Sequence, residues 1–281
     1  MKPAPFAYER ARTVDDAVAA LARDPDAKVL AGGQSLVPMM NMRLARPSRL
    51  VDINGIAELA GVATQAGGGL VLGALVRHTE LATSSLVRAR APLLAAAAAH
   101  VGHRAIRNRG TLGGSVAHAD PAAELPAALL ALDATFVVAG PSGRRRFAAD
   151  AFFVGLLATE LAHDELLVAV EIPPAPPGWG FAELARRAGD FAIAGVAGVL
   201  DADGRARLAA FGVDDRPIRL RAAESALAAG VDAAAAAAAT DCHPADDVHA
   251  SSAYRRHLVT VLTETVIHDA RGRVAAAQQR T

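Results

Sequence analysis

The stretch that decides the fold is Val29-Leu30-Ala31-Gly32-Gly33-Gln34-Ser35-Leu36, in which an apolar run ends in two glycines and a polar pair. The glycines can adopt backbone angles closed to other residues, and they place no Cβ between the main chain and a ligand. Successive backbone N–H groups in such a turn form a concave nest that suits phosphate oxygens. The stretch therefore predicts a strand that runs into an anion-binding turn.

A second stretch of the same kind is Arg107-Asn108-Arg109-Gly110-Thr111-Leu112-Gly113-Gly114-Ser115. A single Gly-Gly pair usually marks only a turn, but two such pairs, each followed closely by serine, suggest two loops that hold one diphosphate. Neither loop has the Gly-x-Gly-x-x-Gly spacing of a nicotinamide-binding Rossmann domain. Ser35 does not lie in a Gly-x-Ser-x-Gly elbow, so hydrolase chemistry is not indicated either.

Composition narrows the class of protein. The 281 residues suffice for one large domain or two ordinary ones, and 52% of them are hydrophobic against 21% charged, so a sizeable core is expected. Acidic and basic residues balance at 29 each, which gives no indication of a nucleic-acid or acidic-lipid partner. Arginine clusters such as 144–146 lack interleaved aromatic residues, and we interpret them as solvated surface or a subunit interface.

Cysteine usage and the N-terminus indicate the compartment. Cys242 is the one cysteine of the sequence, so no disulfide framework is possible and an iron–sulfur cluster cannot be held by this chain alone. The first residues contain no apolar signal segment, and the alanine-rich runs are shorter than the span of about 20 residues that a membrane helix needs. We therefore expect a cytoplasmic protein without a membrane span.

The first 55 residues predict a β-α-β-loop-α-β order. Strands are expected at 5–7, 28–31 and 49–53, a helix capped by Thr13 lies between the first two, and a short helix at 37–44 follows the glycine turn. In residues 56–175 we expect strands at 70–74 and 166–172, helices from Thr79, from Pro92 and up to Leu132, a loop at 102–115 and a hairpin over 135–147.

The best domain boundary is residues 173–178, where four prolines and one glycine stand together. Beyond it, three antiparallel strands are expected at 181–187, 192–200 and 205–213, followed by helices. The last long helix is predicted to present one apolar face made of Tyr254, Leu258, Val261, Leu262 and Thr265.

With both glycine motifs placed, the chain resembles the FAD-binding medium subunit of molybdenum hydroxylases, such as carbon monoxide dehydrogenase and xanthine dehydrogenase. The matching residues are 31–36, 107–115 and Gly189-Asp190-Phe191-Ala192, and the likeness covers nearly the whole chain. The resemblance implies an α+β fold with an FAD-binding domain of the vanillyl-alcohol oxidase type at 1–175, divided into subdomains 1–55 and 56–175. A small C-terminal α+β domain, an antiparallel sheet plus helices, would occupy 178–281.

The resemblance also implies the residues that hold FAD. The diphosphate would lie on Ala31, Gly32, Gly33, Gln34, Ser35, Leu36, Gly110, Thr111, Gly113, Gly114 and Ser115. Asp120 and Glu124 would approach the nucleotide portion, His118 would belong to the flavin loop, and Asp190 and Phe191 would line the flavin. Two positions depart from the pattern: Glu183 stands near a place where many relatives carry lysine, and Ser115 replaces a frequent Asn or Asp.

The implied function is an electron relay in a molybdenum hydroxylase. FAD, bound non-covalently, would receive electrons from [2Fe-2S] clusters of a small partner subunit and pass them to NAD, a quinone or another acceptor. A large partner subunit would hold the molybdenum cofactor, and the assembly would be a dimer of heterotrimers. No catalytic acid, base or nucleophile is required of this chain.

Several alternatives remain open from the sequence. A free-standing FAD oxidase or reductase of the same superfamily and an assembly subunit without flavin would share the glycine motifs. The three arginines Arg104, Arg107 and Arg109 could pair with phosphate, anchor their loop or face a partner. No metal site is expected, because His100 and His103 belong to no His-Glu-x-x-His motif and no clustered cysteines occur.

Overall fold

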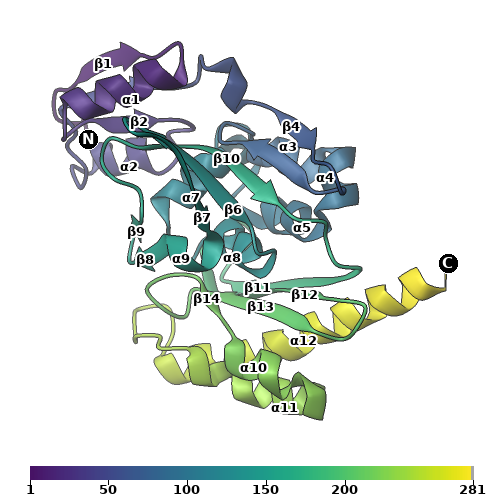
Figure 1. Ribbon diagram of the computed structural model, residues 1–281. Coiled ribbons are helices and arrows are strands. Elements are labelled where there is room, and N and C mark those ends of the chain that lie inside the picture. The colour runs from purple at the N-terminus through teal and green to yellow at the C-terminus, as the bar shows by residue number, and fades with distance from the viewer. Residues whose placement is uncertain (280–281) are drawn as a thin grey trace.

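Three main sheets and one small two-stranded sheet make up the β structure of the computed structural model, which describes residues 1–279. Figure 1 shows the unit that contains the first sheet in purple, the second in blue and teal, and the third in green and yellow, stacked from top to bottom. No helix among these described residues is long and apolar enough to cross a membrane.

The first unit is a parallel sheet with the strand order β1-β3-β2. Its elements are β1 (Ala7–Arg10), α1 (Val14–Arg23), β2 (Lys28–Leu30), α2 (Leu36–Asn41) and β3 (Arg49–Asp52), so the predicted β-α-β-loop-α-β order is confirmed. Thr13 and Asp16 form a reciprocal capping box that starts α1. The first strand begins at Ala7, two residues later than predicted, where pairing with Arg49 starts. Pro5 has no N–H with which to join the ladder.

The second unit is an antiparallel sheet with the order β4-β5-β10-β6-β7. Its elements are η1 (Ala57–Leu59), β4 (Val62–Thr64), β5 (Leu70–Gly73), α3 (His78–Thr83), α4 (Ser85–Arg90), α5 (Pro92–His100), α6 (Arg104–Arg107), α7 (Leu112–His118), α8 (Glu124–Ala131), β6 (Thr135–Gly140), β7 (Gly143–Ala148), α9 (Ala149–Phe152), β8 (Phe153–Gly155), β9 (Ala158–Thr159) and β10 (Leu166–Ile172). Strands β6 and β10 are buried on both faces: Val137 and Val168 join the core under α1, whereas Phe136 and Val170 join the core under α5 and α8.

The expectation of a plain loop at 102–115 is wrong. The short helix α6 interrupts this segment, and α7 begins at Leu112, so the second glycine pair lies inside the first turn of a helix. The cause is local: the Thr111 hydroxyl accepts a hydrogen bond from the Gly114 N–H at 3.1 Å and caps the helix. Gly113 then packs against Ala74, where an added Cβ would lie 2.5 Å from the alanine Cβ.

The third unit is an antiparallel sheet with the order β11-β12-β13-β14 and a layer of helices. Its elements are β11 (Gly178–Ala185), β12 (Ala192–Leu200), β13 (Ala206–Phe211), β14 (Ile218–Arg219), α10 (Arg221–Ala226), η2 (Leu227–Ala229), α11 (Val231–Ala238), η3 (Ala239–Asp241) and α12 (Ser252–Gln278). The long helix α12 crosses the sheet diagonally in Figure 1. It approaches β11 so closely that a Cβ on Gly180 would lie 2.4 Å from the Val266 carbonyl oxygen.

The face predicted for the last helix is only partly right, since Leu258 is buried and Leu262 packs against the core of the third unit. Tyr254 and Val261 are 45% and 43% exposed, and Thr265 is exposed as well. The buried stripe lies about one position around the helix and consists of Arg255, Leu258, Val259, Thr263, Val266, Ile267 and Ala270. Small residues of β11 and β12 leave a shallow sheet surface, and this surface accepts the Val266–Ala270 side of the helix rather than the larger Tyr254.

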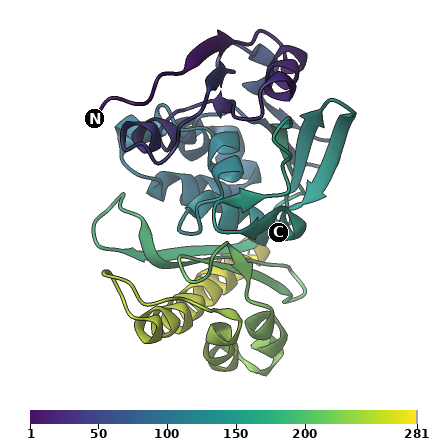
Figure 2. The same cartoon turned by 90° about the vertical axis from the view of Figure 1, so that its left-hand side faces the viewer.

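The second and third units share one hydrophobic core. Ala209 and Phe211 of β13 belong to the same buried cluster as Leu125 and Leu129 of α8. Across this contact the Gly212 N–H donates to the Pro121 carbonyl at 2.7 Å. Two arginines of the third unit, Arg207 and Arg219, form ion pairs with Asp133 at 3.0 and 3.1 Å. Figure 2 shows the third unit pressed against the base of the second.

Candidate cofactor site

A cavity of about 380 Å³ opens where β2 and β3 end, at the carboxyl edge of the parallel sheet. Open α/β sheets bind ligands at this edge. The residues that line the cavity come from both glycine motifs and from the end of β3: Leu30, Ala31, Gly32, Gly33, Gln34, Val37, Pro38, Asp52, Asn54 and Arg109. The cavity is therefore lined by the first motif up to Gln34, without Ser35 and Leu36, and by one residue of the second motif.

The first motif presents unpaired backbone donors. Among the described residues, the N–H groups of 32–36 have no hydrogen-bond partner, and the Ser35 hydroxyl makes no capping bond to α2. Gly33 has φ of +70°, a left-handed conformation that reverses the chain here. The Gln34 side chain folds back and donates to the Gly32 carbonyl at 3.1 Å. A row of free N–H groups beside a cavity suits an anionic oxygen cluster.

Most backbone donors of the second motif are already paired, and the Thr111 N–H is the exception among the described residues. The N–H groups of Leu112 and Gly113 donate to the carbonyls of Val76 and Ala74 at 2.9 and 2.8 Å, and that of Gly114 donates to Thr111. Ser115 follows in the first turn of α7. The second motif therefore forms a rigid wall behind the first motif rather than a second row of free donors.

The two motifs are in direct contact. A Cβ on Gly32 would lie 2.4 Å from the Arg109 carbonyl oxygen and 2.8 Å from the Gly110 Cα. Real Cβ atoms do not approach backbone atoms this closely, so glycine is required at position 32 by the neighbouring motif. The chain thus brings together two stretches that lie about 80 residues apart in the sequence.

The structure separates the roles of the arginines. Arg107 anchors its own loop, because Nη1 donates to the carbonyls of Val101 and Gly102 at 3.0 and 2.7 Å. Arg109 lines the cavity, and within residues 1–279 its side chain forms no hydrogen bond or ion pair. Arg104 is exposed on α6. Arg109 is accordingly the guanidinium available to an anion in the cavity.

His118, Asp120 and Glu124 lie outside this cavity, beyond the other end of α7. The Asp120 carboxylate accepts the Ala122 N–H at 2.9 Å and shapes the turn before α8. Glu124 is only 7% exposed, and burial raises the pKa of its carboxyl to about 7, with the charge of Glu183 acting in the same direction. These residues belong to a second locus, where the second and third units meet.

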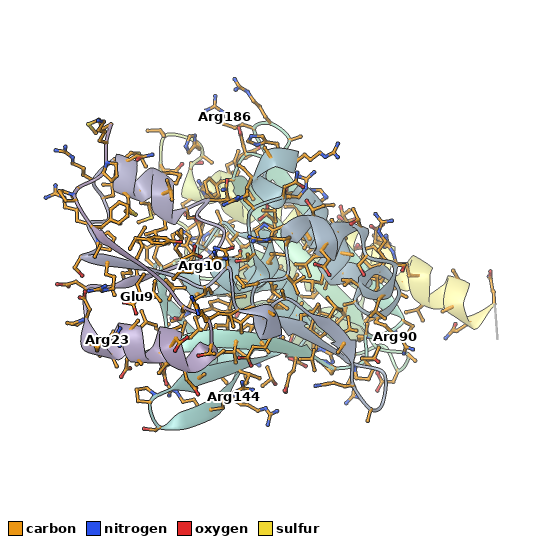
Figure 3. The ribbon with its side chains drawn as sticks, turned by 90° about the horizontal axis from the view of Figure 1, so that it is seen from above. Glu9, Arg10, Arg23, Arg90, Arg144 and Arg186 are labelled. Carbon is orange, nitrogen blue, oxygen red and sulfur yellow. The ribbon has the colours of Figure 1, made fainter. Side chains whose placement is uncertain are left out.

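Asp190 and Phe191 approach the other end of the 102–115 segment. Gly189 has φ of +86°, and a Cβ there would lie 2.8 Å from the Gly102 carbonyl oxygen, so this turn of the third unit rests against the start of the segment. Phe191 is 69% exposed. In Figure 3, Arg186 projects from the same turn, on the side of the molecule opposite Arg144. The same view shows Glu9 of the first unit beside Arg23, its ion-pair partner at 2.9 Å.

Glu183 pairs with a histidine rather than with a lysine or arginine. Its Oε1 lies 3.1 Å from His100 Nδ1, and this bond raises the pKa of His100. The other oxygen, Oε2, is buried and has no partner among the described residues. The charge of Glu124 also raises the pKa of His100, so the three side chains lie close enough to interact across the junction of the two units.

Sequence reasoning missed three polar residues that support the site: Asn54, Arg77 and His78. Asn54 could have been found, because it follows β3 at the carboxyl edge of a parallel sheet. His78 is buried, and burial lowers its pKa to about 4, so the ring is neutral and Nε2 donates to the Thr111 carbonyl at 2.9 Å. No sequence signal marked Arg77 or His78, because their hydrogen-bond partners, the Asn54 side chain and the carbonyls of Arg109 and Thr111, lie far from them along the chain.

Comparison with known proteins identifies the class. Residues 4–175 match the family described as FAD binding domain in molybdopterin dehydrogenase, and residues 179–270 match the CO dehydrogenase flavoprotein C-terminal domain. The 6-hydroxypseudooxynicotine dehydrogenase complex subunit alpha of Paenarthrobacter nicotinovorans is 41% identical over 281 residues, 95% of each chain. The carbon monoxide dehydrogenase medium chain of Hydrogenophaga pseudoflava is 38% identical, over 98% of this chain and 100% of that one.

A solved structure supports the same assignment. A chain of carbon monoxide dehydrogenase from Hydrogenophaga pseudoflava, in a form that lacks the Mo-pyranopterin moiety of the molybdenum cofactor, superimposes with a TM-score of 0.94 at 40% identity. It covers 97% of this chain and 99% of that chain. The chain therefore belongs to the family of FAD-binding medium subunits of molybdenum hydroxylases. The resemblance drawn from the two glycine motifs is confirmed.

Proposed function

We propose that the first glycine motif binds the diphosphate of FAD non-covalently and that Arg109 supplies the balancing charge. The observation that carries this proposal is the row of unpaired N–H groups at 32–36 beside a cavity whose one arginine has no internal partner among the described residues. The residues fit the group: glycines keep Cβ atoms away from the ligand, and free N–H groups with a guanidinium are the donors that phosphate prefers.

The rest of the cofactor would extend from this cavity along α7. We assign the segment with His118, Asp120 and Glu124 to the nucleotide portion and the turn with Asp190 and Phe191 to the flavin, whose face the exposed Phe191 ring would cover. This assignment divides the chain into an FAD-binding domain at 1–175 of the vanillyl-alcohol oxidase type, with subdomains 1–55 and 56–175, and a C-terminal domain at 178–281.

The function that follows is an electron relay inside a molybdenum hydroxylase. FAD, when bound, accepts electrons singly and releases them in pairs, which suits a position between one-electron clusters and a two-electron acceptor. The chain's own residues bind and orient the cofactor and shield it. We assign the molybdenum cofactor to a large partner subunit and the [2Fe-2S] clusters to a small one, in a dimer of heterotrimers in the cytoplasm.

The test is the visible absorption spectrum of the purified full chain after incubation with FAD and desalting. Retained, acid-releasable FAD is the expected result. If the chain alone is colourless, the spectrum is repeated on the chain co-expressed and purified with its large and small subunits. A complex that contains its iron–sulfur clusters but no flavin would overturn the proposal.

A further inference from the structure

Asn54 links the end of β3 to the first glycine motif. Its amide Nδ2 donates to the carbonyls of Ala31 and Leu30 at 2.8 and 3.3 Å, where β2 runs into the glycine turn. The same side chain is fixed from behind by Asp52, whose Oδ1 lies 2.7 Å from Nδ2 and accepts the Asn54 N–H at 2.9 Å. Tyr8 in turn donates its hydroxyl to Asp52 Oδ2 at 2.6 Å.

Arg77 links Asn54 to the second motif. Its Nη2 donates to Asn54 Oδ1 at 2.8 Å, and its Nη1 donates to the Arg109 carbonyl oxygen. The orientation of the Asn54 amide follows from its bonds to Arg77 and Ala31, because only the oxygen can accept from a guanidinium and only the nitrogen can donate to a carbonyl. A continuous path thus runs from the Ala31 carbonyl through two side chains to the Arg109 carbonyl.

The carbonyl that Arg77 holds is the one that touches Gly32. The Arg109 oxygen therefore lies between a guanidinium on one side and the Gly32 Cα on the other. The orientation of this peptide decides where the Arg109 side chain leaves the backbone toward the cavity. A planar guanidinium has two fixed donor directions, so it can set the distance between two acceptors in a way that a lysine cannot.

We infer that Asn54 and Arg77 are positioning residues that fix the spacing between the two glycine motifs and so aim the donors that receive the FAD diphosphate. Neither side chain is needed to touch the cofactor for this role. The inference rests on the proposed function. It adds a pair of residues outside both motifs. Because they act through one shared connection, removing both should weaken cofactor binding hardly more than removing either one.

The test is a double-mutant cycle on the dissociation constant of FAD, with the full chain or, if the chain needs them, the co-purified partners. We expect Asn54→Ala and Arg77→Ala each to raise the FAD dissociation constant about tenfold. The dissociation constant of the double variant should exceed that of the weaker-binding single variant by no more than about twofold. ADP, which shares the diphosphate, should lose affinity in parallel. The matched control is Arg145→Ala, which removes an arginine paired with Glu165 at 2.6 Å on the same unit and should leave FAD affinity unchanged.

The thermal midpoint of the apoprotein separates positioning from stability. Arg77→Lys and Asn54→Asp are the milder variants: lysine cannot span both acceptors, and aspartate cannot donate to Ala31, so both should lose affinity while the midpoint stays near that of the wild type. Unchanged affinity in these variants, or single losses that multiply in the double variant, would overturn the inference. If the wild type itself binds no FAD alone or with its partners, the proposed function fails instead.

Discussion

Gly32 shows how one missing Cβ can decide whether a binding site forms. The position is filled from the opposite side by the Arg109 carbonyl, and neither contacting atom is a flexible side chain that could move away. Glycine is therefore required at position 32 by the Arg109 peptide group far along the chain, whether or not a ligand is bound.

We expect Gly32→Ala to weaken FAD binding by about tenfold or more, because the added methyl group must push the two motifs apart. The measurement is the FAD dissociation constant by flavin fluorescence. The control is Gly61→Ala, since a Cβ at Gly61 would meet no atom within 4 Å. Equal affinities for Gly32→Ala and Gly61→Ala would show that the motifs need not touch for the cofactor to bind.

The sequence predicted the backbone structure of the first glycine motif well and that of the second motif less well. The Gly-Gly-Gln-Ser pattern predicted a turn with free donors, and the structure has it. For residues 110–115 the same pattern could not reveal that the carbonyls of Ala74 and Val76 take up the donors, since these are tertiary contacts. The helix start at Thr111 is a local capping bond, and the expected loop overlooked it. Whether each candidate touches the cofactor stays a prediction.

Among the elements, α12 depends most on glycines that are not its own. Gly178, Gly180 and Gly198 in β11 and β12 leave room for the backbone and small side chains of the helix around Val266 and Ala270. Periodicity in the helix alone placed Leu258 and Leu262 correctly but also assigned Tyr254 and Val261 to the core-facing side, where they do not lie. The choice between the two faces is made by the small residues of a sheet about 70 residues earlier in the chain.

Two glycine substitutions should change stability in opposite directions. Gly180→Ala should destabilise the chain by about 1–3 kcal/mol, because its Cβ would overlap the Val266 carbonyl. Gly272→Ala, within α12 and with no atom near the added methyl group, should stabilise it by about 0.5–1 kcal/mol through helix propensity. Urea unfolding of both variants and the wild type gives the two free energies. A destabilised Gly272→Ala variant would mean that this part of α12 is held by contacts other than its own helix.

For the whole molecule, the junction between the second and third units contains ionisable groups that sense pH. Glu124 is buried there beside Glu183 and His100, and burial is the main reason that its pKa rises to about 7. In the unfolded chain this carboxyl has its ordinary value of 4.5. Between pH 4.5 and pH 7, Glu124 therefore keeps its proton in the folded protein and loses it in the unfolded chain. The free energy of unfolding consequently falls as pH rises from about 4.5 to about 7.

Replacing Glu124 by glutamine removes this dependence. We expect Glu124→Gln to be more stable than the wild-type apoprotein by about 1–3 kcal/mol at pH 8 and of similar stability at pH 5. Urea unfolding at the two pH values provides the comparison, and Glu80→Gln at an exposed position of α3 serves as control. A difference that is the same at both pH values would indicate a packing effect instead of ionisation.

The shared core between the second and third units has a consequence for the proline-rich stretch at 173–177. The two segments of chain are held together by the cluster around Phe211, by the Gly212–Pro121 bond and by two arginines on Asp133, none of which depends on the peptide bonds of that stretch. A protease that severs the folded chain there should leave two fragments that still migrate as one particle in gel filtration and separate only in denaturant. Fragments that part in native buffer would mean that the covalent tether, and not the interface, keeps the two halves in place. If they stay together, the gene could be divided at this point and the halves supplied separately.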